Sequence, residues 1–218
     1  MREKRDQRPF NVAYYARNRA REIERVTSRQ RATLEFLREL RRVPCVDCHG
    51  SFEPHQMDFD HRDPSLKSFT VASSRAMLKQ RDVLITEIAK CDIVCANCHR
   101  VRTYGRFLQS PPRNFIRKAI IDTTRAQRRR DRFREKWSEQ VGLLRAFRKH
   151  ACTDCGRRLP WYAMEFDHRE PGIKCFDVTR KAGRVTLLQL LEELEKCDVV
   201  CANCHRSRTF RRRLGRSA

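Results

Sequence analysis

Hydrophobic residues along the chain form the same succession of patterns twice. Each half has apolar positions at helical spacing, then a short alternating segment, a second helical stripe and a brief apolar run. In the first half these are Phe36, Leu37 and Leu40, then Met57 and Phe59, then Leu84, Ile85 and Ile88, then Ile93 and Val94, and in the second half Leu143, Leu144 and Phe147, then Met164 and Phe166, then Leu190, Leu191 and Leu194, then Val199 and Val200. The pattern predicts helix, strand, helix and strand in each half, followed by a closing helix.

Cysteine and polar motifs repeat in the same register. Cys45-x-x-Cys48 recurs 107 residues later as Cys152-x-x-Cys155, and Lys90 to Arg100 recurs 106 residues later as Lys196 to Arg206. The offset stays constant along the repeat except for one lost residue, which indicates an internal duplication. We therefore predict an α+β protein of two domains, residues 1–110 and 111–218, divided near Pro111 and Pro112, where paired prolines argue against continued helix.

The charge of the chain narrows the class of partner. Its 218 residues include 49 Lys and Arg against 27 Asp and Glu, a formal net charge of +22. Much of this charge lies from Arg17 to Arg31 and from Arg125 to Lys136, which we predict to be basic helices preceding each repeat. Such an excess favours nucleic acid, whose phosphates release counterions on binding. A membrane surface would require a broad apolar helix face, which the second stretch lacks.

The termini and the cysteines bear on the cellular compartment. The first residues lack the apolar core of a secretory signal, and no run of about 18 apolar residues could span a bilayer. We therefore expect a cytoplasmic protein, in which thiols are kept reduced. Eleven cysteines in such a chain indicate metal ligands before disulfides.

Two Cys-x-x-Cys pairs in each repeat supply four thiolates, the donor set of a structural zinc site. The pairs are 46 residues apart in the first repeat and 45 in the second, so the strands and helix between must bring them together. We expect Cys91 and Cys197 to lie in the core and Cys175, opposite Ser68, to be inert. The predicted zinc ligands are Cys45, Cys48, Cys95 and Cys98 for one ion, and Cys152, Cys155, Cys201 and Cys204 for the other.

A second set of polar residues repeats beside the cysteines. A divalent cation that acts on a phosphodiester uses carboxylate or imidazole ligands with open positions, and a neutral imidazole nearby can take a proton from the attacking water. Adjacent strand residues point to opposite faces, so an Asp-His pair serves one site only where the strand ends or twists. A structural, hydrogen-bonded Asp-His pair remains the alternative. The residues are Asp60, His61, Asn97 and His99, and Asp167, His168, Asn203 and His205.

These motifs resemble the zinc-containing, four-cysteine branch of the HNH endonucleases. The resemblance covers residues 45–103 and 152–209 and rests on Cys-x-x-Cys, then Phe-Asp-His-Arg followed by Asp-Pro or Glu-Pro, then Cys-Ala-Asn-Cys-His-Arg. It implies two tandem treble-clef domains with a ββα-metal motif. The basic helices that precede each repeat lie outside the resemblance and are predicted from the charge pattern. The resemblance also implies that His61 and His168 are general bases, and that Asp60, His99, Asp167 and His205 hold a catalytic divalent ion, usually Mg2+ in the family.

The chain departs from the family pattern at the middle Asn. In many relatives this residue precedes the second cysteine pair by several residues and fixes the loop that presents the base, whereas Lys90 and Lys196 stand there in this chain. We assign the role to Asn97 and Asn203 instead.

Basic residues beside the motifs are candidates for phosphate contacts. Lys67 and Lys174 recur three residues after the prolines of the Asp-Pro and Glu-Pro motifs. Arginines also follow the last His on the closing helix, and because that helix would carry a metal ligand, they should lie near the bound backbone. These arginines are Arg100, Arg102, Arg206 and Arg208.

The sequence therefore predicts a metal-dependent DNA endonuclease with two active sites in one chain and double-stranded DNA as its partner. An intramolecular pseudo-dimer of the two repeats is compatible with this organisation. A non-catalytic, zinc-stabilised nucleic-acid-binding protein is the alternative, although binding alone gives no reason to repeat Asp-His and the final His. RNA stays open as a target, because basic charge does not distinguish the sugar.

Overall fold

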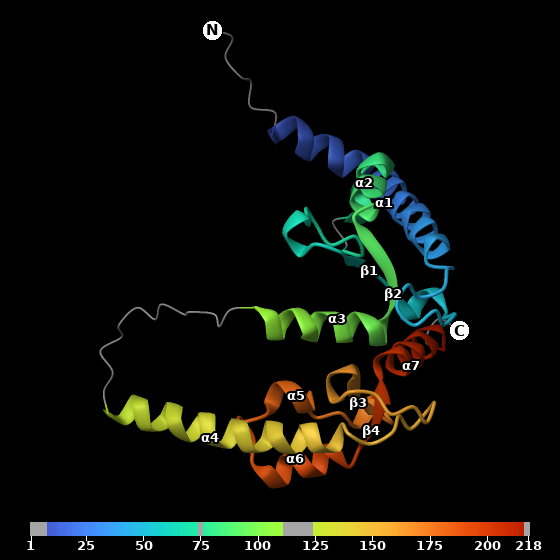
Figure 1. The fold of residues 1–218 in the computed structure, drawn as a ribbon. Coiled ribbons are helices and arrows are strands. Elements are labelled where there is room, and N and C mark those ends of the chain that lie inside the picture. Colours follow the sequence, from blue (N-terminus) through green and yellow to red (C-terminus); the bar gives the residue numbers. More distant parts are fainter. Residues whose placement is uncertain (1–7, 74–75, 111–123, 216–218) are drawn as a thin grey trace. The chain divides into compact units, whose positions relative to one another are not determined.

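The computed structural model describes residues 8–73, 76–110 and 124–215 (Figure 1). Within these ranges the chain forms seven α-helices, short 3-10 turns and two two-stranded sheets. One sheet pairs β1 with β2, and the other pairs β3 with β4. The helices are α1 (Arg8–Leu40), α2 (Arg81–Ile88), α3 (Ala96–Gln109), α4 (Thr124–Phe147), α5 (Val178–Lys181), α6 (Leu187–Leu194) and α7 (Ala202–Leu214). The strands are β1 (Met57–His61), β2 (Cys91–Cys95), β3 (Met164–His168) and β4 (Cys197–Cys201). The predicted α+β class and order of elements are confirmed.

The chain divides into two compact units, Met1–Val94 and Cys95–Ala218. The predicted boundary lay near residue 110, and Pro111 and Pro112 fall outside the described residues. The difference between the two boundaries is helix α3, which belongs to the second unit because it contacts α7 and the 3-10 turn η4 (Trp161–Ala163). A helix encoded in the first repeat thus packs within the second unit.

In the first unit, the predicted apolar face of α1 is buried. Leu37 is 1% exposed and packs in a cluster with Val71, Met77 and Cys91, against which Phe59 of β1 also lies. Cys91 is therefore a core residue, as predicted. Its burial, together with the charge of Glu87, raises the pKa of the thiol to about 11.

The second unit has the equivalent core, built by α4, α5 and α6. Leu144 of α4 packs with Val178, Leu190 and Leu194. Helix α6 begins at a capping box, in which the Thr186 hydroxyl accepts the Gln189 backbone N–H and the Gln189 side chain accepts the Thr186 N–H. The capping box and the apolar stripe explain why this segment is a helix that starts at Leu187.

A buried glutamine ties α4 to the loop before α6. Gln140 is 1% exposed; its side-chain oxygen accepts the Gly183 N–H at 2.6 Å, and its amide donates to the Val185 carbonyl at 3.0 Å. Gly183 has a φ of +78°, and a Cβ there would lie 2.8 Å from Trp137 Cβ, so only glycine fits. Helix α4 is thus anchored to the loop that leads into α6.

The two-stranded sheet of β3 and β4 places the motif residues at fixed positions. The strands pair antiparallel, with Met164 opposite Cys201, Asp167 opposite Asp198 and His168 opposite Cys197. Cys201, the third cysteine of its group, thus lies at one end of the strand pair and the Asp-His pair at the other.

The basic helices α1 and α4 are confirmed as helices, and most of their described side chains are exposed. Some of the charge on α1 is balanced locally, as in the ion pairs of Arg25 with Glu22 and of Arg38 with Glu35. In the part of the chain that the structure describes, no helix is both long and apolar enough to cross a membrane.

Candidate functional site

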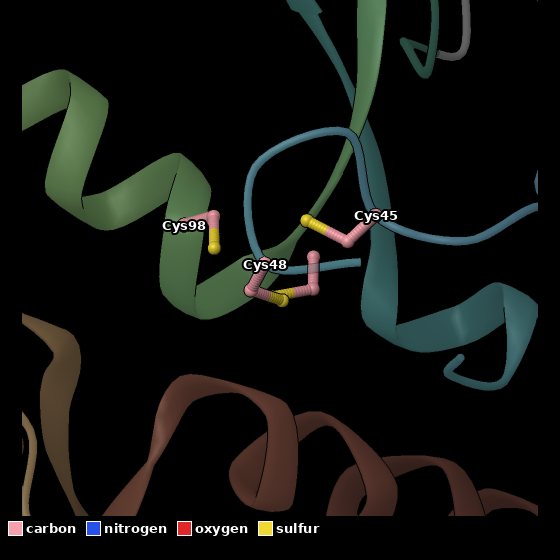
Figure 2. A group of neighbouring side chains, drawn as sticks. Cys45, Cys48 and Cys98 are labelled. Atoms are coloured by element: carbon pink, nitrogen blue, oxygen red, sulfur yellow. The ribbon is translucent and has the colours of Figure 1, made fainter. Parts of the chain in front are cut away.

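Each repeat brings its four predicted cysteines together. In each group the sulfur atoms all lie within 4.8 Å of one another, and no disulfide joins cysteines of the described residues. Figure 2 shows Cys45 and Cys48 on the loop before β1 and Cys98 on the first turn of α3. The groups are Cys45, Cys48, Cys95 and Cys98, and Cys152, Cys155, Cys201 and Cys204.

Tight turns shape each first Cys-x-x-Cys pair. The His49 N–H donates to the Cys45 carbonyl at 2.8 Å, and in the second repeat the Gly156 N–H donates to the Cys152 carbonyl at 2.8 Å. Both His49 and Gly156 have positive φ, +56° and +70°. The left-handed residue turns the backbone so that the two sulfurs of each pair face the same point.

The donor set fits zinc. Four thiolates 2.3 Å from a tetrahedral ion would lie about 3.8 Å apart, and Cys155 Sγ lies 4.0 Å from Cys201 Sγ. Burial opposes ionisation of Cys152, but backbone N–H groups, that of Cys201 foremost, lower its pKa to about 7. Burial and then the charge of Cys201 raise the pKa of Cys204. A cation is therefore needed for all four to be thiolates together.

In the second repeat, the predicted base His168 is held by a buried glutamate of α6. His168 Nε2 lies 2.8 Å from Glu193 Oε1, and the side chains are 8% and 2% exposed. The same carboxylate oxygen accepts the backbone N–H groups of Cys175 at 2.8 Å and Phe176 at 3.2 Å. Its other oxygen accepts Lys196 Nζ at 2.8 Å. Glu193 thus joins the histidine to the loop after β3.

The first repeat repeats this arrangement within the first unit. His61 Nε2 lies 2.9 Å from Glu87 Oε1, and that oxygen accepts the backbone N–H groups of Ser68 and Phe69 at 2.8 and 3.1 Å. Lys90 Nζ donates to the other oxygen of Glu87 at 2.7 Å. The same set of bonds occurs in both units, so the His-Glu pair is a common structural feature of the two repeats.

The sequence patterns do not single out Glu87 and Glu193. Each is an acidic residue within an apolar helical stripe, and each stands three residues before the repeated Lys90 or Lys196. Their recurrence at an offset of 106 is the signal that could have identified them. In each unit this Glu-Lys pair holds the loop after the first strand. The sequence prediction had assigned the loop-fixing role to Asn97 and Asn203.

We expect the Glu193 carboxylate to make the fold acid-sensitive. Burial opposes its ionisation, but bonds from Lys196, His168 and two backbone N–H groups lower its pKa to about 2. The folded-state pKa is depressed, so this stabilisation is complete above the unfolded value near 4.3 and is lost as pH falls towards 2. The difference in free energy of unfolding between wild type and Glu193→Gln should therefore shrink from about pH 5 to pH 3. Urea unfolding at each pH measures it; a constant difference would contradict the ionised state.

His205 lies between two carboxylates at the start of α7. Its Nε2 is 3.4 Å from Asp167 Oδ1, and its Nδ1 bonds Glu165 Oε2. These hydrogen bonds, with Asp167 first and Glu165 second, raise the pKa of His205 to about 9 against the opposing effect of burial. The predicted metal-ligand pair, Asp167 and His205, is therefore brought together, and the imidazole is cationic at neutral pH.

Two arginines of α7 also hold Asp167. Arg212 donates to both carboxylate oxygens, at 2.7 and 2.9 Å, and Arg208 donates to Oδ2 at 3.1 Å. Burial opposes ionisation, but these bonds and that of His205 keep the pKa of Asp167 well below its usual range. Arg208 also bonds Asp154 and Asp198, so this predicted phosphate-contacting residue is engaged with three carboxylates.

The residue types at Asp167 and His205 fit a divalent ion. A converging carboxylate and imidazole, completed by water and substrate oxygens, is a set that such ions use. His205 would have to bind as the neutral imidazole. Arg212 would have to give up at least one of its bonds to the Asp167 carboxylate.

In the first repeat, Asp60 is 4% and His61 6% exposed at the end of β1. His99 is half-buried on the first turn of α3, which belongs to the second unit. Asn97 and Asn203 begin α3 and α7 and hold each other: Asn203 Oδ1 accepts the Asn97 N–H at 3.0 Å, and Asn97 Oδ1 accepts the Asn203 N–H at 3.2 Å. Each of the two side chains thus caps the facing helix of the other repeat.

The other predicted basic residues lie at the surface to different degrees. Lys67 and Lys174 are exposed, Arg100 is exposed and pairs with Glu165, and Arg102 and Arg206 are half-buried. A cavity of about 480 Å³ lies beside His168 and His205. Its lining includes four cationic side chains: Arg100, Arg148, Lys174 and Arg180.

Comparison of the chain with family models, with characterised proteins and with solved structures finds no match. The likeness to HNH endonucleases therefore rests on the sequence motifs alone.

Proposed function

We propose that the protein is a metal-dependent endonuclease that hydrolyses DNA phosphodiester bonds, with one active site in each repeat of a treble-clef, HNH-like fold. The observation that carries the proposal is the buried His-Glu pair at the end of the strand, present in both repeats. In the second unit, His168 and a cation-rich lining share one cavity. Zinc-binding alone gives no reason for this pair.

The hydrogen bond of His168 assigns its tautomer. Glu193 Oε1 also accepts two backbone N–H groups, so it is an acceptor and His168 Nε2 carries the proton. The other ring nitrogen, Nδ1, then has the lone pair that can take a proton from an attacking water. Glu193 stabilises the imidazolium that forms, because a carboxylate beside a histidine favours its charged state.

Asp167 and His205 would hold the divalent ion, which supplies stabilisation of negative charge on the phosphate and leaving oxygen. Lys174, Arg100 and Arg180 line the same cavity and would contact the DNA backbone. In this assignment Arg212 would have to give up its bonds to Asp167 and would then be a further phosphate contact.

One observation favours the alternative, a zinc-stabilised protein that only binds nucleic acid. Both oxygens of Asp167 are already taken by Arg208 and Arg212. If these arginines stay bonded to Asp167, the carboxylate is not available to a divalent ion. The second repeat would then bind nucleic acid without cutting it.

Plasmid cleavage with Mg2+ tests the proposal, comparing wild type with His61→Ala, His168→Ala and the double variant. Loss of a general base costs about 10²–10⁴-fold in rate. Each single variant should therefore nick the plasmid, and the double variant should leave it intact. The control is His150→Ala, because His150 is exposed and has no counterpart in the first repeat.

Cutting by the double variant at the wild-type rate would contradict the base assignment. Wild-type protein that binds DNA but cuts with none of Mg2+, Mn2+, Co2+ or Zn2+ would favour the binding protein.

A further inference from the structure

One wall of the cavity in the second unit is aromatic. Tyr104 of α3 stacks on Tyr162 with ring centroids 4.1 Å apart and an interplanar angle of 15°. Trp161 meets Tyr104 edge-on at 5.3 Å, and Arg145 lies over the Trp161 ring at 4.6 Å. All three rings line the cavity and are only partly buried.

The rest of the lining is rich in positive charge. Arg100, Arg148, Lys174 and Arg180 outnumber the carboxylates of Glu165 and Asp177. Glu165 is already bonded to Arg100 and His205. The cavity therefore has unbalanced positive charge beside partly exposed ring surfaces.

The shared fold does not require these rings. The residues at the positions of Trp161 and Tyr162 in the first repeat, 107 residues earlier, are Pro54 and His55. Both segments are nevertheless 3-10 turns that lead into a strand, η1 (Pro54–Gln56) and η4. The aromatic wall is thus a property of the second repeat and of Tyr104, which α3 contributes from the first.

We propose that this cavity is a subsite for an unpaired DNA base, whose phosphate lies on the neighbouring cations. Bases stack on aromatic side chains with little regard to sequence, and Lys and Arg hold the phosphates. The volume lies within the range of pockets that take small organic groups. The inference rests on the proposed function, because it takes DNA as the ligand. It deepens that function by assigning to the second site a preference for strands with an unpaired base.

Fluorescence of Trp161 tests the subsite directly. The chain has two tryptophans, Trp137 and Trp161, so Trp137→Phe leaves Trp161 as the sole reporter. The probes are a single-stranded thymidine oligonucleotide of roughly 12 nucleotides and an abasic strand of the same length and charge, each end-labelled for anisotropy and without divalent ion. The thymidine strand should quench Trp161 and bind about tenfold more tightly, since stacking contributes roughly 1–3 kcal/mol per base.

Variants of Trp161 separate stacking from charge. Trp161→Leu, in the otherwise wild-type chain, should raise the Kd of the thymidine strand to that of the abasic strand, while Trp161→Phe should keep most of the difference. Zinc content and circular dichroism show whether each variant is folded; if Trp161→Leu is not, quenching in Trp137→Phe protein decides the question.

Equal Kd values for the two strands, or binding without quenching, would overturn the subsite, as would the absence of binding to both. Plasmid cleavage separates this result from the proposed function. Cleavage without discrimination between the strands would remove only the subsite, whereas discrimination without cleavage would remove only the nuclease activity.

Discussion

Replacing Cys201 by Ser is expected to unfold the second zinc domain and to reduce the zinc content from two ions per chain to one. Cys201 is 1% exposed, ends β4 and belongs to the four-sulfur group. Structural zinc contributes about 10–16 kcal/mol of binding free energy in small domains, which matches or exceeds the 5–15 kcal/mol stability of a typical domain. The zinc domain should therefore not stay folded without the ion. Metal analysis and limited proteolysis measure the two effects.

The chain offers matched controls for this experiment. Cys175→Ser should change neither zinc content nor protease resistance, because Cys175 is exposed and lies outside both groups. Cys45→Ser should remove one zinc ion from the other repeat. Two ions per chain and unchanged protease resistance in Cys201→Ser would show that this group does not bind structural zinc.

Glu193→Gln is expected to lower the rate of DNA cleavage by the second repeat by on the order of 100-fold. Glutamine keeps the size of the side chain but removes the charge that stabilises the His168 imidazolium. The measurement requires a His61→Ala background, so that only the second repeat cuts. Because Glu193 is assigned to the reaction step and not to DNA binding, kcat should fall while KM stays near its wild-type value.

The split between kcat and KM distinguishes a positioning role from a structural one. A rate loss together with a lower zinc content would mean that Glu193 only supports the fold, and an unchanged rate would remove it from the mechanism. Glu192→Gln is the matched control, because Glu192 is exposed on the same helix. Zinc content, measured in both variants, reports whether the domain is intact.

The duplication does more than supply a second copy of the site. Helix α3 is encoded in the first repeat, but its Arg100 and Tyr104 line the cavity of the second unit. Asn97 of the same helix exchanges backbone hydrogen bonds with Asn203. The second repeat therefore depends on the first for part of its candidate site.

The repeated sequence by itself determined the order of elements and both four-cysteine groups. Apolar spacing of 3.6 or 2 specifies helix or strand locally, and Leu37 and Leu144 are buried as that spacing requires. The two four-cysteine groups were predictable because eight cysteines recur in register and four converging thiolates are a common donor set of structural zinc. The Asp-His pair at the end of the strand was predictable for the same reason of register.

Only the tertiary structure decided which partner each polar side chain meets. Neighbouring strand residues point to opposite faces, so Asp167 meets Arg208 and Arg212 of α7 while His168 meets Glu193 of α6. Likewise, nothing in the local pattern around Asn97 indicates that it would cap the helix of Asn203. These contacts join residues far apart in the chain. Their geometry depends on how the helices pack on the two-stranded sheet, and local periodicity does not encode that packing.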